Sequence, residues 1–309
     1  MKVGFVYDEL YLKHHYPDHP ERRERLTAII ESLDREALLK EVNLIEPRRA
    51  TAEEVALNHD PAYIQELHDF CKAGGGFLDP DTYATEDSYD VALKAVGGVL
   101  EGIDRVLGKE VEAVFCAVRP PGHHAEYAKA MGFCLFNNVA IGARYLQSKG
   151  VERVFIIDFD AHHGNGTQRS FYQDSTVFYF STHQYPFYPG TGSAQEKGAG
   201  AGEGYTLNVP MPAGAGDEDY SPVYCKLLPK VMENFNPGFV LVSAGYDLHS
   251  DDPLTYLNVS TEGVRTIVRG ILTACRELGI PTLFTLEGGY NLRALGECAV
   301  VTLEEMLGS

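Results

Sequence analysis

Short runs of consecutive apolar residues alternate along the chain with longer segments in which apolar positions recur at helical spacing. The runs are almost continuously apolar, which is typical of parallel strands covered on both faces. Strands are predicted at Val3–Tyr7, Ala113–Val118, Arg153–Asp158, Thr176–Ser181, Tyr205–Val209, Phe239–Ala244 and Thr282–Leu286. Amphipathic helices are predicted at Glu21–Leu33, Pro61–Ala73, Ser88–Leu107, Asn137–Lys149, Pro222–Asn234, Thr261–Leu278 and Leu292–Leu307. This alternation predicts a single α/β domain with a mainly parallel central sheet flanked by helices.

Composition narrows the class of protein. Of 309 residues, 44% are hydrophobic and 23% are charged, which excludes a disordered or fibrous chain. Lys and Arg number 26 against 44 Asp and Glu, so the formal net charge is −18. An acidic surface disfavours nucleic acid and anionic membranes as partners, and no apolar run is long enough to span a bilayer. The sequence does not indicate an oligomeric state.

The cysteines and the N-terminal residues indicate the cellular compartment of the protein. The six cysteines form no CxxC pair. Several, such as Cys116, lie inside apolar runs, where a reduced core thiol is expected. Met1–Asp8 lacks the long apolar segment of a signal peptide. We therefore expect a cytoplasmic protein.

Candidate metal ligands follow two of the predicted strands, at the edge where parallel sheets bind ligands. Asp158, Asp160 and His162 recur at every second residue, so an extended backbone would place them on one face. Asp247, which follows the strand Phe239–Ala244, could complete a set of two carboxylates and one histidine. Such a set suits zinc and leaves positions open for water and substrate. Taken singly, each residue could equally cap the helix that follows.

Candidate proton-transfer groups follow two other strands. His123 and His124 come after a Pro-Pro-Gly turn and suit a general-base pair acting on metal-bound water. Asp158 and Asn165 are natural orienting partners for these imidazoles. Tyr290 follows a Gly-Gly turn, from which its hydroxyl could reach a developing oxyanion.

Together these segments resemble the histone deacetylase superfamily, which includes acetoin-utilisation-type proteins and acetylpolyamine amidohydrolases. The resemblance covers essentially the whole chain. It runs through His19–Leu26, His59–Tyr63, Arg119–His124, Gly132–Asn138, Asp158–Thr167, Tyr188–Gly192, Ala244–Pro253 and Glu287–Asn291. Asn165 and the Leu-Glu-Gly-Gly-Tyr-Asn run are similar to the class II branch. The resemblance implies one catalytic domain, residues 1–309, with the three-layer fold of arginases and deacetylases.

The resemblance also implies a role for each site residue. Asp160, His162 and Asp247 would bind one zinc ion. His123 would face Asp158 and His124 would face Asn165, with His124 as the general base and acid and Tyr290 bonded to the substrate carbonyl. Gly132, Phe133, Tyr188, Leu254 and, on a looser match, Asp81 would bind the substrate. Asp158 and Ser181 match a potassium site. Tyr188 departs from the commonest pattern, in which a second phenylalanine takes this position.

The implied reaction is zinc-assisted hydrolysis of an N-acyl amide, with acylated lysine side chains of proteins as the expected substrates. Acetylated polyamines are the alternative, and the apolar Leu254 favours acyl-lysine because it offers no charge to a second ammonium group. An arginase-like enzyme with two manganese ions would need a carboxylate where Gly164 stands. A non-catalytic acyl-lysine binder is disfavoured because all the catalytic residues are present.

Overall fold

The computed structural model describes residues 2–308 and is built around an eight-stranded sheet. The strand order is β2 (Asn43–Ile45), β1 (Val3–Val6), β5 (Ala113–Cys116), β10 (Thr282–Leu286), β9 (Phe239–Ala244), β6 (Val154–Asp158), β7 (Val177–Gln184) and β8 (Thr206–Met211). All neighbouring strands in this sheet are parallel. Their carboxyl ends therefore meet at one edge. A separate antiparallel pair joins β3 (Gly76–Phe77) to β4 (Tyr83–Ala84).

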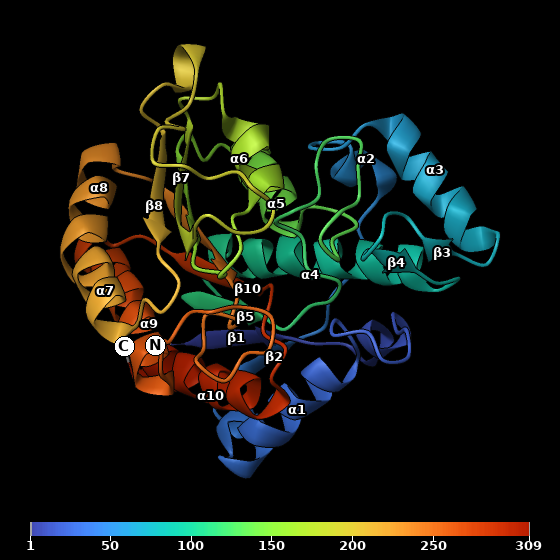
Figure 1. Ribbon diagram of the computed structural model, residues 1–309, viewed down its shortest axis with the longest axis horizontal. Helices are drawn as coiled ribbons and strands as arrows, with labels where there is room; N and C mark the ends of the chain where they lie inside the picture. The colour runs from blue at the N-terminus through green and yellow to red at the C-terminus, as the bar shows by residue number, and fades with distance from the viewer. Residues whose placement is uncertain (1, 309) are drawn as a thin grey trace.

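Helices cover both faces of the sheet (Figure 1). One layer holds α4 (Ser88–Leu107), α5 (Asn138–Ser148) and α6 (Asn165–Phe171), with α2 (Ala52–Val55) and α3 (Pro61–Lys72) beside them. The other holds α1 (Glu24–Arg35), α9 (Thr261–Leu278) and α10 (Leu292–Gly308), with α7 (Asp217–Pro222) and α8 (Leu228–Phe235) against α9. Short 3₁₀ turns lie at Glu9–Lys13, Leu38–Lys40 and Gly200–Gly202. The predicted single-domain, three-layer α/β fold is confirmed.

Local sequence explains where these elements begin and end. All six residues of β9 are buried, as a continuous apolar run requires. Helix α9 begins after Ser260, whose side chain accepts a hydrogen bond from the amide of Gly263. It ends at Gly279, which adopts the left-handed conformation with φ of 66°. No helix among residues 2–308 has the length and apolarity needed to cross a membrane.

The elements that the sequence did not predict are short or irregular. Strand β2 has two exposed residues out of three, so it carries no apolar run. The helix predicted at Pro222–Asn234 is broken into α7, a π-helical turn at Val223–Leu227, and α8. Pro229, which lacks an amide hydrogen, lies in the first turn of α8. The amide of Leu228, the residue before it, bonds the carbonyl of Val223 five residues back, which is the hydrogen-bond spacing of a π-turn.

Candidate active site

The candidate site lies at the carboxyl ends of β5, β10, β9 and β6, which are consecutive neighbours in the sheet. The histidine pair follows β5, the Gly-Gly-Tyr turn follows β10, Asp247 follows β9, and Asp160 and His162 follow β6. Because parallel strands lie about 4.8 Å apart, side chains that leave adjacent strand ends converge. The fold thus brings together residues that are up to about half the chain apart.

Asp160, His162 and Asp247 form a cluster whose possible ligand atoms all lie within 4.8 Å of one another. His162 Nδ1 is 2.8 Å from Asp247 Oδ2 and 3.2 Å from Asp160 Oδ1. Strand β6 ends at Asp158, so Asp160 and His162 belong to the loop that follows rather than to an extended strand. Two carboxylates and one imidazole are a donor set that fits zinc and leaves positions open.

The cluster concentrates negative charge in a buried place. Burial and the neighbouring charge of Asp160 raise the pKa of Asp247 to about 7. Burial acts to lower the pKa of His162, but the carboxylates of Asp247 and Asp160 outweigh it and raise that pKa to about 10. In the metal-free site the imidazole is therefore the cation that balances the carboxylates, at a position where a metal ion would do the same.

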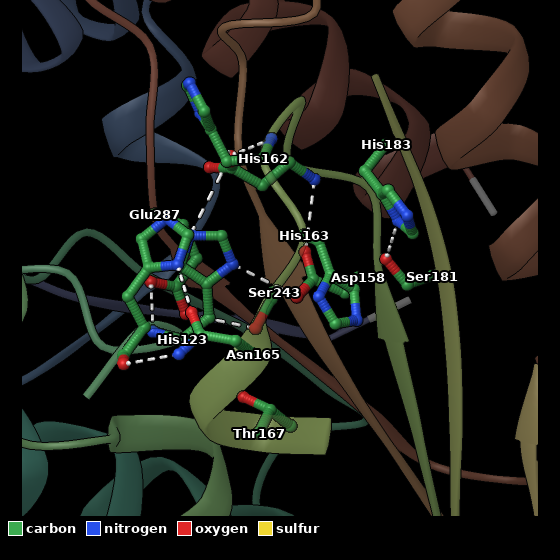
Figure 2. A network of polar contacts seen from close by, with 12 residues as sticks. His123, Asp158, His162, His163, Asn165, Thr167, Ser181, His183, Ser243 and Glu287 are labelled. Atoms are coloured by element: carbon green, nitrogen blue, oxygen red, sulfur yellow. Dashed lines mark hydrogen bonds and ion pairs between the residues drawn. The ribbon is translucent and has the colours of Figure 1, made fainter. Parts of the chain in front are cut away.

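The two adjacent histidines lie side by side, with ring centroids 4.0 Å apart. His123 Nδ1 is 3.1 Å from Asp158 Oδ2, and His124 Nδ1 is 2.8 Å from Asn165 Oδ1. Tyr179 donates a further hydrogen bond to Asp158 Oδ2. Figure 2 shows His123, Asp158 and Asn165 within one network of polar contacts. Each imidazole is thus oriented by a different partner.

These partners give the two imidazoles opposite protonation states. Burial disfavours charge on His123, but Asp160 and Asp158 raise its pKa to about 10. The pKa of His124 is held well below its usual range by burial and by the nearby His123 and His162. Asn165 offers a neutral amide, which cannot compensate as a carboxylate would. These pKa shifts make His123 cationic and His124 neutral at neutral pH.

The loop that carries Tyr290 is held in place because its backbone amides donate hydrogen bonds to carboxylates of neighbouring loops. The amide of Tyr290 donates to Asp252 Oδ2 at 2.7 Å, and the amide of Gly288 donates to Asp160 Oδ2 at 2.8 Å. Burial raises the pKa of the Tyr290 hydroxyl well above its usual value, so the phenol stays protonated. It can therefore serve as a hydrogen-bond donor to an oxyanion.

The aromatic residues predicted for substrate binding flank these groups. The Phe133 ring lies 5.7 Å from that of Tyr290, and the Tyr188 ring lies 5.3 Å from that of His124. Gly132 has φ of 56°, and a Cβ there would come within 2.4 Å of the His124 ring. Only glycine allows this segment to pack against the imidazole.

Asp81 and Leu254 border the same region. The hydroxyl of Thr82 donates to Asp81 Oδ1 at 3.1 Å and accepts from the amide of Phe133 at 3.1 Å, which ties Asp81 to the aromatic wall. The amide of Leu254 donates to Asp252 Oδ1 at 2.9 Å. Since Asp252 also accepts a hydrogen bond from the amide of Tyr290, Leu254 lies on a loop anchored to the Gly-Gly-Tyr turn.

Ser181 lies directly beside Asp158, because the parallel register of β6 and β7 pairs these two residues. The hydroxyl of Ser181 is 2.8 Å from His183 Nδ1, an interaction drawn in Figure 2. Asp158 and Ser181 are both buried. Oxygen atoms of this kind suit a hard cation.

Glu287 is a structural support of the site that the sequence analysis did not single out. Its Oε2 accepts hydrogen bonds from the amides of Gly122 at 2.7 Å and His123 at 3.1 Å, and Ser243 donates to its Oε1 at 3.0 Å. Burial raises its pKa to about 7. The glutamate thereby fixes the backbone that carries the tandem histidines (Figure 2).

A second support is a fully buried set of charges beneath Tyr290. Arg119 Nη2 donates to Glu21 Oε2 at 2.6 Å, and Arg25 Nη1 donates to Glu21 Oε1 at 3.2 Å. Arg25 Nε also donates to the carbonyl of Gly289 at 2.7 Å. The sequence did contain a signal for this buried set of charges. Arg119 directly follows an apolar strand, and a charge at such a position needs a buried partner.

A cluster of side chains that could hold a metal ion, faced by paired histidines and a tyrosine at the carboxyl edge of a parallel sheet, is the arrangement expected of an α/β enzyme. The family model for the histone deacetylase domain matches residues 19–306. The chain is 43% identical over 296 residues to a probable deacetylase of Archaeoglobus fulgidus, covering 94% of this chain and 82% of that protein.

Two further relatives agree with this match. Histone deacetylase 14, chloroplastic, of Arabidopsis thaliana is 38% identical, over 96% of this chain and 75% of that protein. The crystal structure of the HDA15 HD domain aligns with a TM-score of 0.95 at 36% identity, covering 100% of this chain and 88% of that one. The chain belongs to the histone deacetylase family, as its sequence predicts, and is a deacetylase of that family, which makes it a hydrolase.

Proposed function

We propose that this protein is a zinc-dependent amidohydrolase that removes acetyl and other acyl groups from lysine side chains of proteins. The observation that carries the proposal is the convergence of Asp160, His162 and Asp247 in one cluster, with both aspartates buried and His162 partly exposed. The neutral imidazole of His124 lies beside this cluster, with its ring centroid 6.1 Å from that of His162. We further propose that residues 1–309 act as a single catalytic domain.

Zinc is the metal that this donor set suits best. Asp160, His162 and Asp247 would hold it, and when bound it would polarise the acyl carbonyl and an attacking water. The negative charge of the two buried carboxylates, Asp160 and Asp247, supports the binding of a divalent cation between them.

The residues around the cluster would move and hold protons. His124, neutral at neutral pH, would accept the proton of the attacking water at Nε2 and later protonate the leaving amine. His123, kept cationic by Asp160 and Asp158, would hold its proton and stabilise negative charge. The Tyr290 hydroxyl would donate a hydrogen bond to the developing oxyanion of the substrate.

The walls of the site support an acyl-lysine chain as the ligand. Phe133 and Tyr188 would flank an extended alkyl chain, and Gly132 would give it room beside His124. Asp81 at the rim would accept hydrogen bonds from a peptide backbone. Leu254 offers no charge to a second ammonium group, which favours acyl-lysine over acetylpolyamines.

We also propose that Asp158 and Ser181 contribute oxygen atoms to a potassium site. Their pairing in the parallel register of β6 and β7 supports this assignment. A cytoplasmic location stays a prediction.

The test is turnover by zinc-loaded protein on an acetyl-lysine peptide and on acetylated polyamines, side by side. We expect kcat/KM to favour the peptide by about tenfold or more, which corresponds to about 1.4 kcal/mol. The reverse ratio would instead support a polyamine amidohydrolase, and hydrolysis of neither substrate would contradict both. Tyr290→Phe should lose about 10²–10³ in kcat, the usual cost of an oxyanion donor. Tyr145→Phe, which alters a remote tyrosine bonded to Asp104, is the matched control.

A further inference from the structure

The side-chain amide of Asn165 bridges His124 to a second acidic residue, Glu126. Asn165 Oδ1 is 2.8 Å from His124 Nδ1, and Asn165 Nδ2 donates to Glu126 Oε1 at 3.0 Å. The amide therefore has a partner at each end. A carboxylate at position 165 would need no second partner to orient the imidazole, whereas an amide does, because its two ends differ chemically.

The surroundings of the Asn165 amide admit only one orientation. Besides Glu126, its nitrogen faces the carbonyl of His124 at 3.5 Å and the sulfur of Met131 at 3.4 Å, both of them acceptors. The reversed amide would set its oxygen against the Glu126 carboxylate, leaving two acceptors face to face. Since Oδ1 must then face His124, the imidazole has to carry its proton on Nδ1. The Nε2 lone pair is left free to act as a base.

Glu126 is itself held in place. Arg169 Nη1 donates to its Oε2 at 3.0 Å, and its backbone amide bonds the carbonyl of Lys129 at 2.9 Å. The segment also lies close to α6, because a Cβ on Gly166 would come within 2.2 Å of the Ala125 carbonyl oxygen. The Glu126 side chain is 22% exposed and the Arg169 side chain is 74% exposed, so this chain of contacts runs from solvent to the His124 imidazole.

We infer that Glu126 is a positioning residue that fixes the tautomer of the His124 imidazole by orienting the Asn165 amide. The inference rests on the proposed hydrolytic function, in which His124 is the base. It also assigns a purpose to the neutral residue at position 165. Through the Asn165 amide, the Glu126 carboxylate orients the His124 imidazole without touching it. A carboxylate in direct contact would favour the charged imidazolium.

The test begins with Glu126→Gln. Arg169 keeps the new amide oxygen on its own side, so the Gln nitrogen faces Asn165. This favours the reversed Asn165 amide, because the remaining acceptors of its nitrogen, the His124 carbonyl at 3.5 Å and the Met131 sulfur at 3.4 Å, are weaker than a carboxylate. His124 Nδ1 then has to accept a hydrogen bond, and the proton moves to Nε2. We expect kcat to fall about 10- to 100-fold, as is usual for an outer-shell partner, with KM nearly unchanged. The melting temperature should stay close to that of the wild type.

A second substitution should restore the network. In Glu126→Gln/Asn165→Asp, one oxygen at position 165 accepts from the Gln nitrogen and the other from His124 Nδ1. Because the aspartate also raises the pKa of His124, kcat is compared on the pH plateau above the acid limb of each variant. There we expect kcat to recover to within about fivefold of the wild type, which a purely structural role for Glu126 would not produce. Glu101→Gln is the matched control, because Glu101 is 17% exposed and accepts from Arg105 at 2.8 Å, far from the site.

Ring ¹⁵N spectra of histidine-labelled, zinc-loaded protein give a readout that is independent of activity. His124 should carry its proton on Nδ1 in the wild type and the double variant, and on Nε2 in Glu126→Gln. The inference is overturned if Glu126→Gln keeps the Nδ1 proton, if its kcat stays within about threefold of the wild type, or if the double variant does not recover. If wild-type protein hydrolyses no acyl amine, the proposed function fails, and the spectra still decide the tautomer.

Discussion

The guanidinium group of Arg25 lies over the ring of Tyr290, with its central carbon 5.0 Å from the ring centroid. Its Nε also donates to the carbonyl of Gly289, the residue before Tyr290. One buried side chain thus holds both the ring and the turn that carries it. The expected consequence is that Tyr290 loses its fixed orientation when Arg25 is changed.

Arg25→Met keeps the length of the side chain but removes its charge and donors. We expect kcat to fall about 10- to 100-fold while KM changes little, because the hydroxyl must be in place when the oxyanion forms. Steady-state kinetics on an acetyl-lysine peptide measure both constants. Arg35→Met, an exposed change on the same helix, is the control. Equal kcat in Arg25→Met and the control would show that Tyr290 needs no such support.

Metal binding should release protons. At pH 7 the metal-free cluster holds a proton on His162, whose pKa is raised to about 10, and part of one on Asp247, whose pKa is raised to about 7. Ligands must be deprotonated to bind zinc, so these protons leave. Calorimetric titration with zinc in two buffers of different ionisation enthalpy counts them.

We expect about one to two protons released at pH 7, and fewer as the pH rises through the pKa values of these groups. Asp247→Asn should both weaken zinc binding and reduce the proton count. A binding heat that is the same in both buffers would contradict the assignment of His162 and Asp247 as ligands.

The pH profile should report the proposed base, His124. Its pKa is held well below 6.5, so the neutral, active form is present above that pKa and is lost as pH falls through it. The acid limb of kcat/KM should therefore lie well below pH 6.5. Asn165→Asp brings a carboxylate to Nδ1, favours the imidazolium and should move the limb to higher pH. A limb that does not move would exclude His124 as the titrating base.

The buried charges beneath the site should dominate local stability. Arg119→Met leaves Glu21 with a single arginine partner inside the core, where both side chains are fully buried. Breaking a buried pair from one side typically costs about 3–5 kcal/mol in the free energy of unfolding. Denaturant titration measures this change. Arg105→Met, at a half-exposed pair with Glu101, should have little effect, and similar losses in both variants would contradict the argument.

The sequence predicted most of the fold because its central strands are continuously apolar. Strands such as β9 and β10 are buried along their whole length and match the predicted ranges. Where burial does not decide the conformation, the pattern was less informative. The exposed strand β2 was not predicted, and the π-helical turn before Pro229 falls inside a segment predicted as one continuous helix.

The predicted site residues come together for a topological reason, since ends of neighbouring parallel strands must meet. Residues that only hold the site residues in place were harder to find. Glu287 bonds main-chain amides and Glu126 bonds an amide side chain, and neither interaction leaves a spacing pattern in the sequence. Helix α1 begins at Glu24 rather than at the predicted Glu21, because Glu21 turns into the core to pair with Arg119.

The position of β10 in the sheet has a consequence for how the protein is made. It is the last strand in chain order, yet it lies between β5 and β9 near the middle of the sheet. During translation, β2-β1-β5 and β9-β6-β7-β8 can form only as two separate halves, each with an unpaired edge of the kind that promotes aggregation. Ribosome-bound intermediates should therefore need chaperone protection until Leu286 emerges, and the enzyme should acquire its catalytic centre in a single late step of synthesis.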